Sequence, residues 1–321
     1  MNQFDTPQQR KQNTSLFGTL FGFIILLFAG SFIQTVPIYA VVYRMLYPWM
    51  NEMTEKMLSG SITVEEAMPL MEKTVYAISE HPICLVASLV GTMGIIGVCL
   101  YWCWGVQRRP LSFMGIRKEK AVPHYLLGIA VGFVMFAAAI GISILSGAAT
   151  VSRAKEFSWA YIGLFFFGFL IQGLEEELLL RGYLMNSLRG RMSRFGAVML
   201  SSLMFGLLHM GNQGITFLAL TNLTLFGIFA GIYFMRTNSI WGVAAIHSVW
   251  NFVQGNFWGC SVSGMPLYDS IFVTTMAPDR ATTNGGAFGP EGGLGVTIVL
   301  TVGIFLLLWS AIPSEKKKQK T

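Results

Sequence analysis

Long hydrophobic runs separated by short polar segments dominate the chain. A helix that crosses a hydrocarbon core of roughly 30 Å needs about 20 mostly apolar residues. About eight runs reach that length, near 15–43, 83–106, 124–146, 158–188, 194–211, 214–235, 238–257 and 293–312. The pattern predicts an all-α polytopic membrane protein with about eight transmembrane helices around an intramembrane polar cavity.

The first run and the polar loop after it, residues 44–80, have features of their own. The run is long, contains Pro37 well inside, and is followed by no convincing small-residue cleavage site, so we expect it to remain as a helix. Within the loop, Thr63 is followed three residues later by Glu66, the spacing of a capping box. This spacing predicts a short amphipathic helix around 62–78.

Composition and charge agree with a membrane protein. Hydrophobic residues make up 53% of the chain and charged residues 12%, whereas about 25% of residues are charged in soluble domains. Basic clusters alternate along the chain with segments poor in net positive charge, such as the loop 44–80, and lie at Arg10–Lys11, 108–120, 189–194, Arg236 and 316–320. The positive-inside rule then predicts a multi-pass protein of the cell membrane with both termini cytoplasmic and 44–80 extracytoplasmic.

Other function classes find little support. The net charge of +6 is explained by topology and anionic lipid, and no recognisable nucleic-acid-binding module is present. The cysteines match no zinc or disulfide spacing and are interpreted as small buried residues: Cys84, Cys99, Cys103 and Cys260. No internal repeat divides the chain, so residues 1–321 are predicted to form a single membrane domain. The loop 258–292 could gate a site or merely connect two helices, and connection is favoured.

Three polar clusters interrupt the hydrophobic runs in the second half of the chain. They are Glu176-Glu177-Leu178-Leu179-Leu180-Arg181, Phe205-Gly206-Leu207-Leu208-His209 and His247-Ser248-Val249-Trp250-Asn251. Ionisable side chains at membrane depth are costly and usually mark function. The clusters are therefore the candidate site.

The first cluster suggests two carboxylates with different tasks. Glu177 and Arg181 are four residues apart and can pair on one helix face, while Glu176 points about 100° away and lacks that partner. Glu176 is thus the candidate general base. The alternative is a solvated helix end on the cytoplasmic side, and Glu175 is the residue that this alternative suits best.

The other two clusters supply partners at similar depth. A turn near 190–193 places Glu176 and His209 each about 16 residues from it, or roughly 25 Å along a helix. His247 and Asn251 share a helix face and could donate hydrogen bonds to an oxyanion. The alternative for them is ordinary interhelical hydrogen bonding, worth about 0.6 kcal/mol.

Together these residues predict a site that activates water, and two kinds of activation stay open. A glutamate and a histidine could hold the water directly. Alternatively, zinc could be bound by three candidate ligands, Glu176, His209 and His247, with one coordination position left open. No His-Glu-x-x-His helix is present, so the sequence alone does not decide whether a metal is required.

The ordered motifs resemble the CPBP (ABI) family of intramembrane proteases, which includes the type II CAAX prenyl endopeptidases. The motifs are Glu176-Glu177-x-x-x-Arg181, Phe205-x-x-x-His209 and His247-x-x-x-Asn251. The resemblance covers about 160–257 firmly, and two outer segments, Leu111 to Lys118 and Gly285 to Gly292, also look like bacterial members. The family-like core then spans about 120–312, with the N-terminal segment and loop 44–80 as an extension.

The resemblance implies a role for each motif residue. Glu176 matches the base that activates water, and His209 matches the residue that positions the same water. His247 and Asn251 match the pair that holds the oxyanion, and the supporting residues are Glu177, Arg181 and Phe205. Family members have been described both as glutamate-type and as metal-dependent proteases. Glu175 as the base would depart from the family spacing.

The sequence therefore predicts an intramembrane endopeptidase that cuts a membrane-associated peptide or protein, which could be a prenylated CAAX-type substrate. The alternative is a catalytically silent membrane adaptor or bacteriocin-immunity protein that binds a peptide or lipidated partner in the same cavity. A transporter ranks last, because internal repeats and paired broken helices are not evident.

Overall fold

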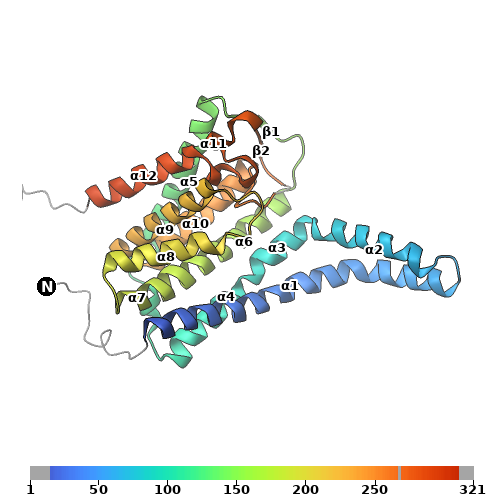
Figure 1. The fold of residues 1–321 in the computed structure, drawn as a ribbon, viewed down its shortest axis with the longest axis horizontal. Helices are drawn as coiled ribbons and strands as arrows, with labels where there is room; N and C mark the ends of the chain where they lie inside the picture. The colour runs from blue at the N-terminus through green and yellow to red at the C-terminus, as the bar shows by residue number, and fades with distance from the viewer. Residues whose placement is uncertain (1–14, 267–268, 311–321) are drawn as a thin grey trace, which may run out of the picture.

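The computed structural model describes residues 15–266 and 269–310. It consists of a helical bundle from which one long helical hairpin projects (Figure 1). The basic clusters at Arg10–Lys11 and 316–320, on which the predicted orientation of the termini partly rests, lie outside the described residues. The orientation therefore stays a prediction.

The projecting hairpin is formed by α1 (Leu16–Leu58) and α2 (Val64–Ser79). The helix predicted for 15–43 continues to Leu58, so most of the predicted polar loop is helical. The capping box that predicts α2 is present: the Thr63 amide donates to Glu66 Oε2 at 2.9 Å, and the Glu66 amide donates to Thr63 Oγ1 at 3.3 Å. The hydrogen bonds from Thr63 hold the pKa of the Glu66 carboxyl below its ordinary value.

The next segment joins this hairpin to the bundle. Helices α3 (Pro82–Gly91) and α4 (Met93–Tyr101) run into a π-helical turn, η2 (Trp102–Val106), and together match the predicted span 83–106. α1 packs against both helices. At Gly30 the backbones approach closely, since a Cβ atom there would lie 2.7 Å from the Ile95 Cα. After η2 comes a 3₁₀ turn, η3 (Leu111–Met114).

The bundle itself contains the polar clusters. α6 (Trp159–Glu177) continues through a π-helical segment, η4 (Leu178–Met185), into α7 (Asn186–Arg189). The remaining elements are α5 (Ala121–Leu145), α8 (Arg194–Leu208), α9 (Phe217–Thr237), α10 (Ile240–Phe252), η5 (Val253–Phe257) and α12 (Leu294–Trp309). α10 packs against α5 and α6, and its residues 242–251 are all buried, so it forms the centre of the bundle.

The prediction of eight spans is not confirmed. Among the described residues, the helices long and apolar enough to cross a membrane are four, Leu16–Leu58, Pro82–Val106, Ala121–Leu145 and Phe217–Thr237. The other predicted runs are helical but shorter or interrupted. At 15 residues α8 measures about 22 Å, less than a hydrocarbon core of about 30 Å. The chain is still a multi-pass membrane protein.

The prediction of an all-α fold is also wrong in one detail. β1 (Ala149–Arg153) and β2 (Phe272–Met276) form a two-stranded antiparallel sheet, with Ala149 opposite Met276. The strands come from segments far apart in sequence and are only five residues each, too short for a clear periodicity. Asn284 holds the sheet end in place, since its Nδ2 donates to the carbonyls of Ala148 and Ala277, both at 2.8 Å.

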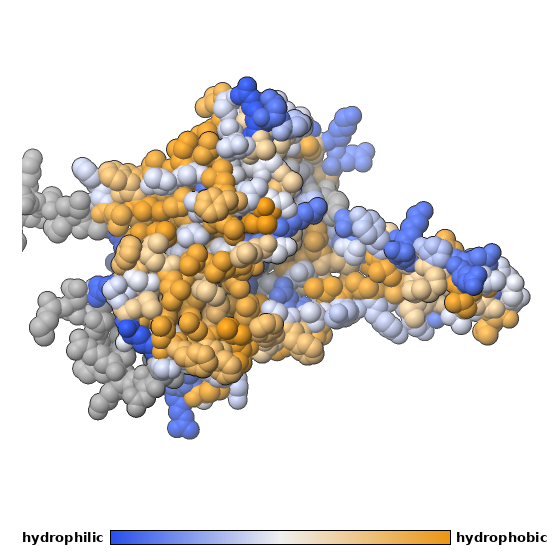
Figure 2. Space-filling model, in the orientation of Figure 1, coloured by the Kyte–Doolittle hydropathy of each residue, from blue (hydrophilic) through white to orange (hydrophobic). Residues whose placement is uncertain are grey.

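The loop 258–292 is thus a folded cap rather than a simple connection. Besides β2 it contains three 3₁₀ turns and one short helix, η6 (Pro278–Arg280), α11 (Ala281–Asn284), η7 (Gly286–Phe288) and η8 (Pro290–Gly292). It lies at the same end of the bundle as β1 (Figure 1). Figure 2 shows mostly hydrophobic surface over the helices, with hydrophilic surface gathered at the loops, as expected for a protein in a bilayer.

Gly30→Ala should weaken the packing of α1 on α4, because the added methyl group meets the Ile95 Cα atom as well as the base of its side chain, and the backbone cannot move aside cheaply. We expect a loss of about 1–3 kcal/mol in stability, seen as a lower melting temperature of the detergent-purified protein. Gly97→Ala is the matched control, since a Cβ atom there meets nothing within 4 Å. Equal melting temperatures for the two variants would contradict a tight α1–α4 contact.

Candidate active site

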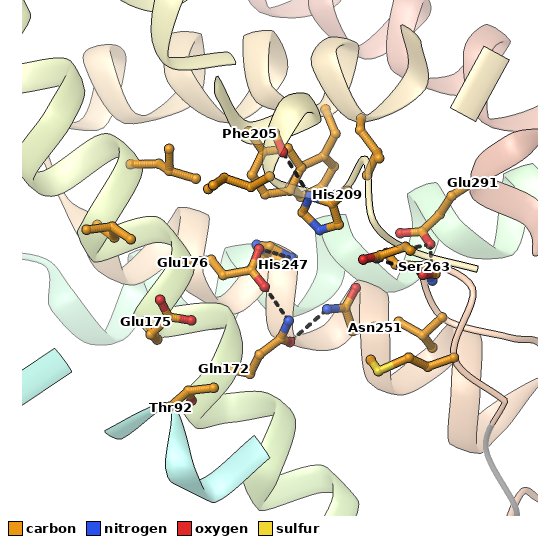
Figure 3. Close-up of a pocket in the computed structure, with 18 of the residues that line it drawn as sticks. Thr92, Gln172, Glu175, Glu176, Phe205, His209, His247, Asn251, Ser263 and Glu291 are labelled. Carbon is orange, nitrogen blue, oxygen red and sulfur yellow. Dashed lines mark hydrogen bonds and ion pairs between the residues drawn. The ribbon is translucent and has the colours of Figure 1, made fainter. Parts of the chain in front are cut away.

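A cavity of about 480 Å³ opens among α1, α3, α6, α8, α10 and the cap 258–292 (Figure 3). The predicted catalytic residues all line it: Glu176, His209, His247 and Asn251. They come from three separate helical segments, so the fold brings together side chains that are up to 75 positions apart along the chain, from 176 to 251.

The site is organised around the Glu177 carboxylate, which is fully buried. Its Oε1 accepts a hydrogen bond from Arg181 Nη1 at 2.9 Å, which is the predicted pair, and a second from His247 Nδ1 at 2.9 Å. This contact across α6 and α10 is possible because Gly173 has no side chain: a Cβ atom there would lie 2.4 Å from Ser248 Oγ. Glu177 therefore joins two helices at one oxygen.

The contact also fixes the proton on His247. A carboxylate oxygen accepts, so Nδ1 must donate, and Nε2 is left toward the cavity. Nε2 lies 3.8 Å from Glu176 Oε2, beyond hydrogen-bond distance. The imidazole ring packs edge-on against Phe226, with centroids 4.9 Å apart. His247 is thus held rigidly with one nitrogen facing Glu176.

Arg181 is completely buried and is held mainly by two groups. Besides the bond to Glu177, its guanidinium carbon lies 4.9 Å from the centroid of the Phe205 ring. The Arg181 Nε and Nη2 atoms have no hydrogen-bond partner among the described residues. Phe205 therefore supports the site through its ring face, because the face of an aromatic ring attracts a cation.

Glu176 differs from its neighbour in exposure and in bonding. Its side chain is 18% exposed, against 0% for Glu177, and it faces the cavity. Gln172 Nε2 donates to Glu176 Oε1, and Gln172 Oε1 accepts from Asn251 Nδ2 at 2.9 Å. The other oxygen, Oε2, has no hydrogen-bond partner among the described residues. Glu177 Oε2 also lacks such a partner, so the two carboxylates differ in the bonding of Oε1 and in their exposure to the cavity.

His209 lies at the end of α8 rather than inside a span, because the helix ends at Leu208 and the predicted range 194–211 is too long. Its Nδ1 is 2.8 Å from the carbonyl oxygen of Phe205. A carbonyl only accepts, so Nδ1 donates and Nε2 of the neutral ring is an acceptor. Figure 3 shows the ring on the cavity wall, on the side of Glu176 and Asn251.

Two residues of the site were missed by the sequence reasoning. Gln172 is four residues before Glu176 and shares its helix face, so the spacing was a usable signal. Glu291, within the family-like segment Gly285 to Gly292, lines the cavity and accepts at Oε2 from the Ser263 amide at 2.6 Å and from Gln254 Nε2 at 3.1 Å. No local pattern connects Glu291 with those partners.

The interpretation of Glu175 as a solvated helix end is wrong. The residue is 5% exposed and lines the cavity. Figure 3 shows it on the Thr92 side of α6, away from His209 and His247. Glu175 therefore belongs to the wall of the cavity and not to the group around Glu176.

The residues do not fit a three-ligand metal centre as they stand. Among residues 15–266 and 269–310, no group of three or more His, Cys, Asp or Glu side chains is arranged to hold a metal ion. Glu176, His209 and His247 share the cavity without forming such a group, and each imidazole donates from Nδ1, to Phe205 or to Glu177, which leaves its Nε2 available. The four cysteines are buried and free, and none lines this cavity.

Residues 157–253 match a protein-family model described as "Type II CAAX prenyl endopeptidase Rce1-like". The matched segment runs from the start of α6 into η5 and contains every residue of the three polar clusters. Comparisons with curated proteins and with solved structures found no match. The family predicted from the motifs is confirmed for this segment, while the α1–α2 hairpin and the cap lie outside it.

Arg181→Ala should destabilise the fold, because it leaves Glu177 buried beside a single donor. Breaking a buried ion pair costs about 3–5 kcal/mol, so we expect a low folded yield and a lower melting temperature. Lys56→Ala is the control: it breaks another i,i+4 pair, with Glu52, whose side chains are 47% and 59% exposed, and should cost less than about 1 kcal/mol. Similar melting temperatures would show that Glu177 does not depend on Arg181.

Proposed function

Because its segment 157–253 belongs to the Rce1-like family of type II CAAX prenyl endopeptidases, we propose that this multi-pass membrane protein is an intramembrane endopeptidase. It hydrolyses a peptide bond of a membrane-associated substrate with a water molecule activated by Glu176. The observation that carries the proposal is the contrast between two adjacent glutamates. Glu177 has no exposed surface and its Oε1 accepts from both Arg181 and His247, whereas the Glu176 side chain is 18% exposed and lines the cavity.

The first step is activation of water. Glu176 Oε2 takes one proton of the water, and His209 Nε2 accepts the other hydrogen and so fixes its orientation. The water oxygen then attacks the carbonyl carbon of the scissile bond. Gln172 donates to the opposite oxygen of Glu176, which keeps the carboxylate from rotating.

The second step is stabilisation of the oxyanion that forms on the carbonyl oxygen. Asn251 uses one N–H for Gln172 and retains another for the oxyanion. His247 donates from Nε2 when its ring is protonated, and the Glu177 carboxylate on Nδ1 stabilises that positive ring. Removal of one such donor typically costs about 10²–10³ in kcat. Glu176 finally returns its proton to the leaving amine, and the peptide bond breaks.

The shape of the cavity supports a substrate with a hydrophobic part. One side is lined by apolar residues from α1, α3, α4 and η4, namely Leu27, Phe28, Leu89, Ile95 and Leu179. A transmembrane segment or a lipid-bearing peptide can place apolar groups there while the scissile bond meets Glu176. A prenylated CAAX-type peptide is the first substrate to test. A silent adaptor would use the same walls but would not need the Glu176 carboxylate in the cavity.

Glu176→Gln should abolish cleavage and leave the fold intact, because the amide is isosteric but takes up no proton. We expect turnover of quenched fluorescent peptides, prenylated and unprenylated, to fall by at least about 10²-fold with an unchanged melting temperature. Glu175→Gln is the matched control, since it changes the adjacent wall carboxylate and should retain turnover.

The same assay with a metal chelator separates the kinds of catalysis. Turnover by the parent protein that persists with chelator supports Glu176 and His209 alone, and turnover that stops overturns this step. Absence of cleavage of every peptide by a well-folded parent protein would favour the adaptor.

Gln172→Leu should reduce turnover less than Glu176→Gln does, because it removes the link between Glu176 and Asn251 but neither group itself. We expect kcat to fall by about 10-fold, the cost of roughly one net hydrogen bond of 1–1.5 kcal/mol. Gln34→Leu is the control, since Gln34 lines the same cavity but bonds only to the Ser88 carbonyl. Equal rates for the two variants would remove Gln172 from the mechanism.

A further inference from the structure

A second cavity, of about 690 Å³, lies at the opposite end of the bundle from the cap. It forms where α7, α9 and α12 end and α8 begins (Figure 1). None of its lining residues is shared with the cavity around Glu176. The second cavity is therefore separate from the candidate active site.

The rim of this cavity carries a concentration of positive charge. Arginines from four segments of the chain line it, namely Arg117, Arg189, Arg194 and Arg236, and its lining includes no aspartate or glutamate. Arg117 Nε is buried and has no hydrogen-bond partner among the described residues. Arg236 Nη1 donates to the Leu307 carbonyl and to Ser310 Oγ, which holds that guanidinium at the end of α12. Arg117 Nε is therefore a donor available to an anion.

The walls below the rim are apolar. They are formed by α8, α9 and α12 through Val198, Met199, Leu225, Ile228, Ile232, Ile304 and Leu307. These are helices of the membrane-embedded bundle, and α9 is one of the helices long enough to cross a bilayer. A soluble anion would fill the rim and leave the walls uncovered. An uncharged lipid would cover the walls but bring no negative charge to the arginines that line the rim.

We infer that this cavity binds an anionic phospholipid, with its phosphate among the arginines and one acyl chain between α8, α9 and α12. Guanidinium groups recognise phosphate oxygens with two parallel hydrogen bonds. The basic clusters 108–120, 189–194 and Arg236 predict that this end faces the cytoplasm, where membrane lipids carry negative charge. Basic pockets between membrane helices on that side suit such head groups. The inference does not rest on the proposed proteolysis.

The test compares an anionic phospholipid with two ligands that each lack one of its features, either the net negative charge or the acyl chains. Phosphatidylglycerol, phosphatidylcholine and glycerol 3-phosphate are added separately to the full-length protein in detergent. Bound lipid is counted by native mass spectrometry, and stability is followed by thermal melting. We expect phosphatidylglycerol alone to bind at one site and to raise the melting temperature. Equal binding of phosphatidylcholine, or an equal effect of glycerol 3-phosphate without acyl chains, would overturn the inference.

Substitutions of the arginines that line the second cavity test whether the lipid binds there. Combining Arg117→Gln, Arg194→Gln and Arg236→Gln should weaken phosphatidylglycerol binding by about a hundredfold, since each basic residue contributes about 1 kcal/mol. The control combines Arg108→Gln, Lys118→Gln and Lys120→Gln, which removes exposed charges at residues that do not line the cavity. Similar loss in both sets would mean that lipid binds to surface charge only.

A wall variant keeps the inference testable if the triple variant folds poorly. Ile228→Trp fills the apolar part and removes no charge, so it should also abolish binding of phosphatidylglycerol. Glu176→Gln should bind the lipid as the parent protein does, because Glu176 lies in the other cavity. Full binding by the Ile228→Trp variant would overturn the placement of the acyl chain.

Discussion

One buried oxygen organises the centre of this protein: Glu177 Oε1 accepts from Arg181 on its own helix and from His247 on α10. A carboxylate removed from water is costly unless donors surround it, so this contact restricts how α6 and α10 can sit against each other. It also sets the tautomer of His247. The position of the His247 Nε2 atom in the cavity is thus determined by a residue that does not itself line the cavity.

The three consecutive glutamates have identical side chains but lie in three different environments, because each points in a different direction from the helix. Successive residues point about 100° apart, so Glu175 lies in the cavity wall, Glu176 faces the group of polar side chains and Glu177 lies in the core. Their chemistry differs because their partners differ. The exposure of Glu176 to the cavity, and the two hydrogen bonds that Glu177 Oε1 accepts, both follow from the directions in which these side chains point.

Local spacings in the sequence predicted the parts of the structure that depend on one helix. The Thr63–Glu66 capping box and the Glu177–Arg181 pair both follow from residues three or four apart, and both are present. The contact of Gln172 with Glu176 has the same four-residue spacing, so it was equally predictable from the sequence. Features that join distant segments, such as the Glu291–Ser263 contact and the pairing of β1 with β2, have no local signature.

Hydropathy was a poorer guide to where helices end, since the run predicted for 194–211 extends past the end of α8 at Leu208, and α1 continues through polar sequence to Leu58.

The π-helical segment η4 begins directly after Glu177 and contains Arg181. Such segments are rare and often occur at functional sites. Deleting one residue between Glu177 and Arg181 would rotate everything after it by about 100° and direct the guanidinium away from its carboxylate. The loop between α1 and α2 imposes no such rule, so length changes during evolution should accumulate there and be absent between 177 and 181. The spacing within this motif is therefore constrained by helix geometry as much as its residue types are constrained by chemistry.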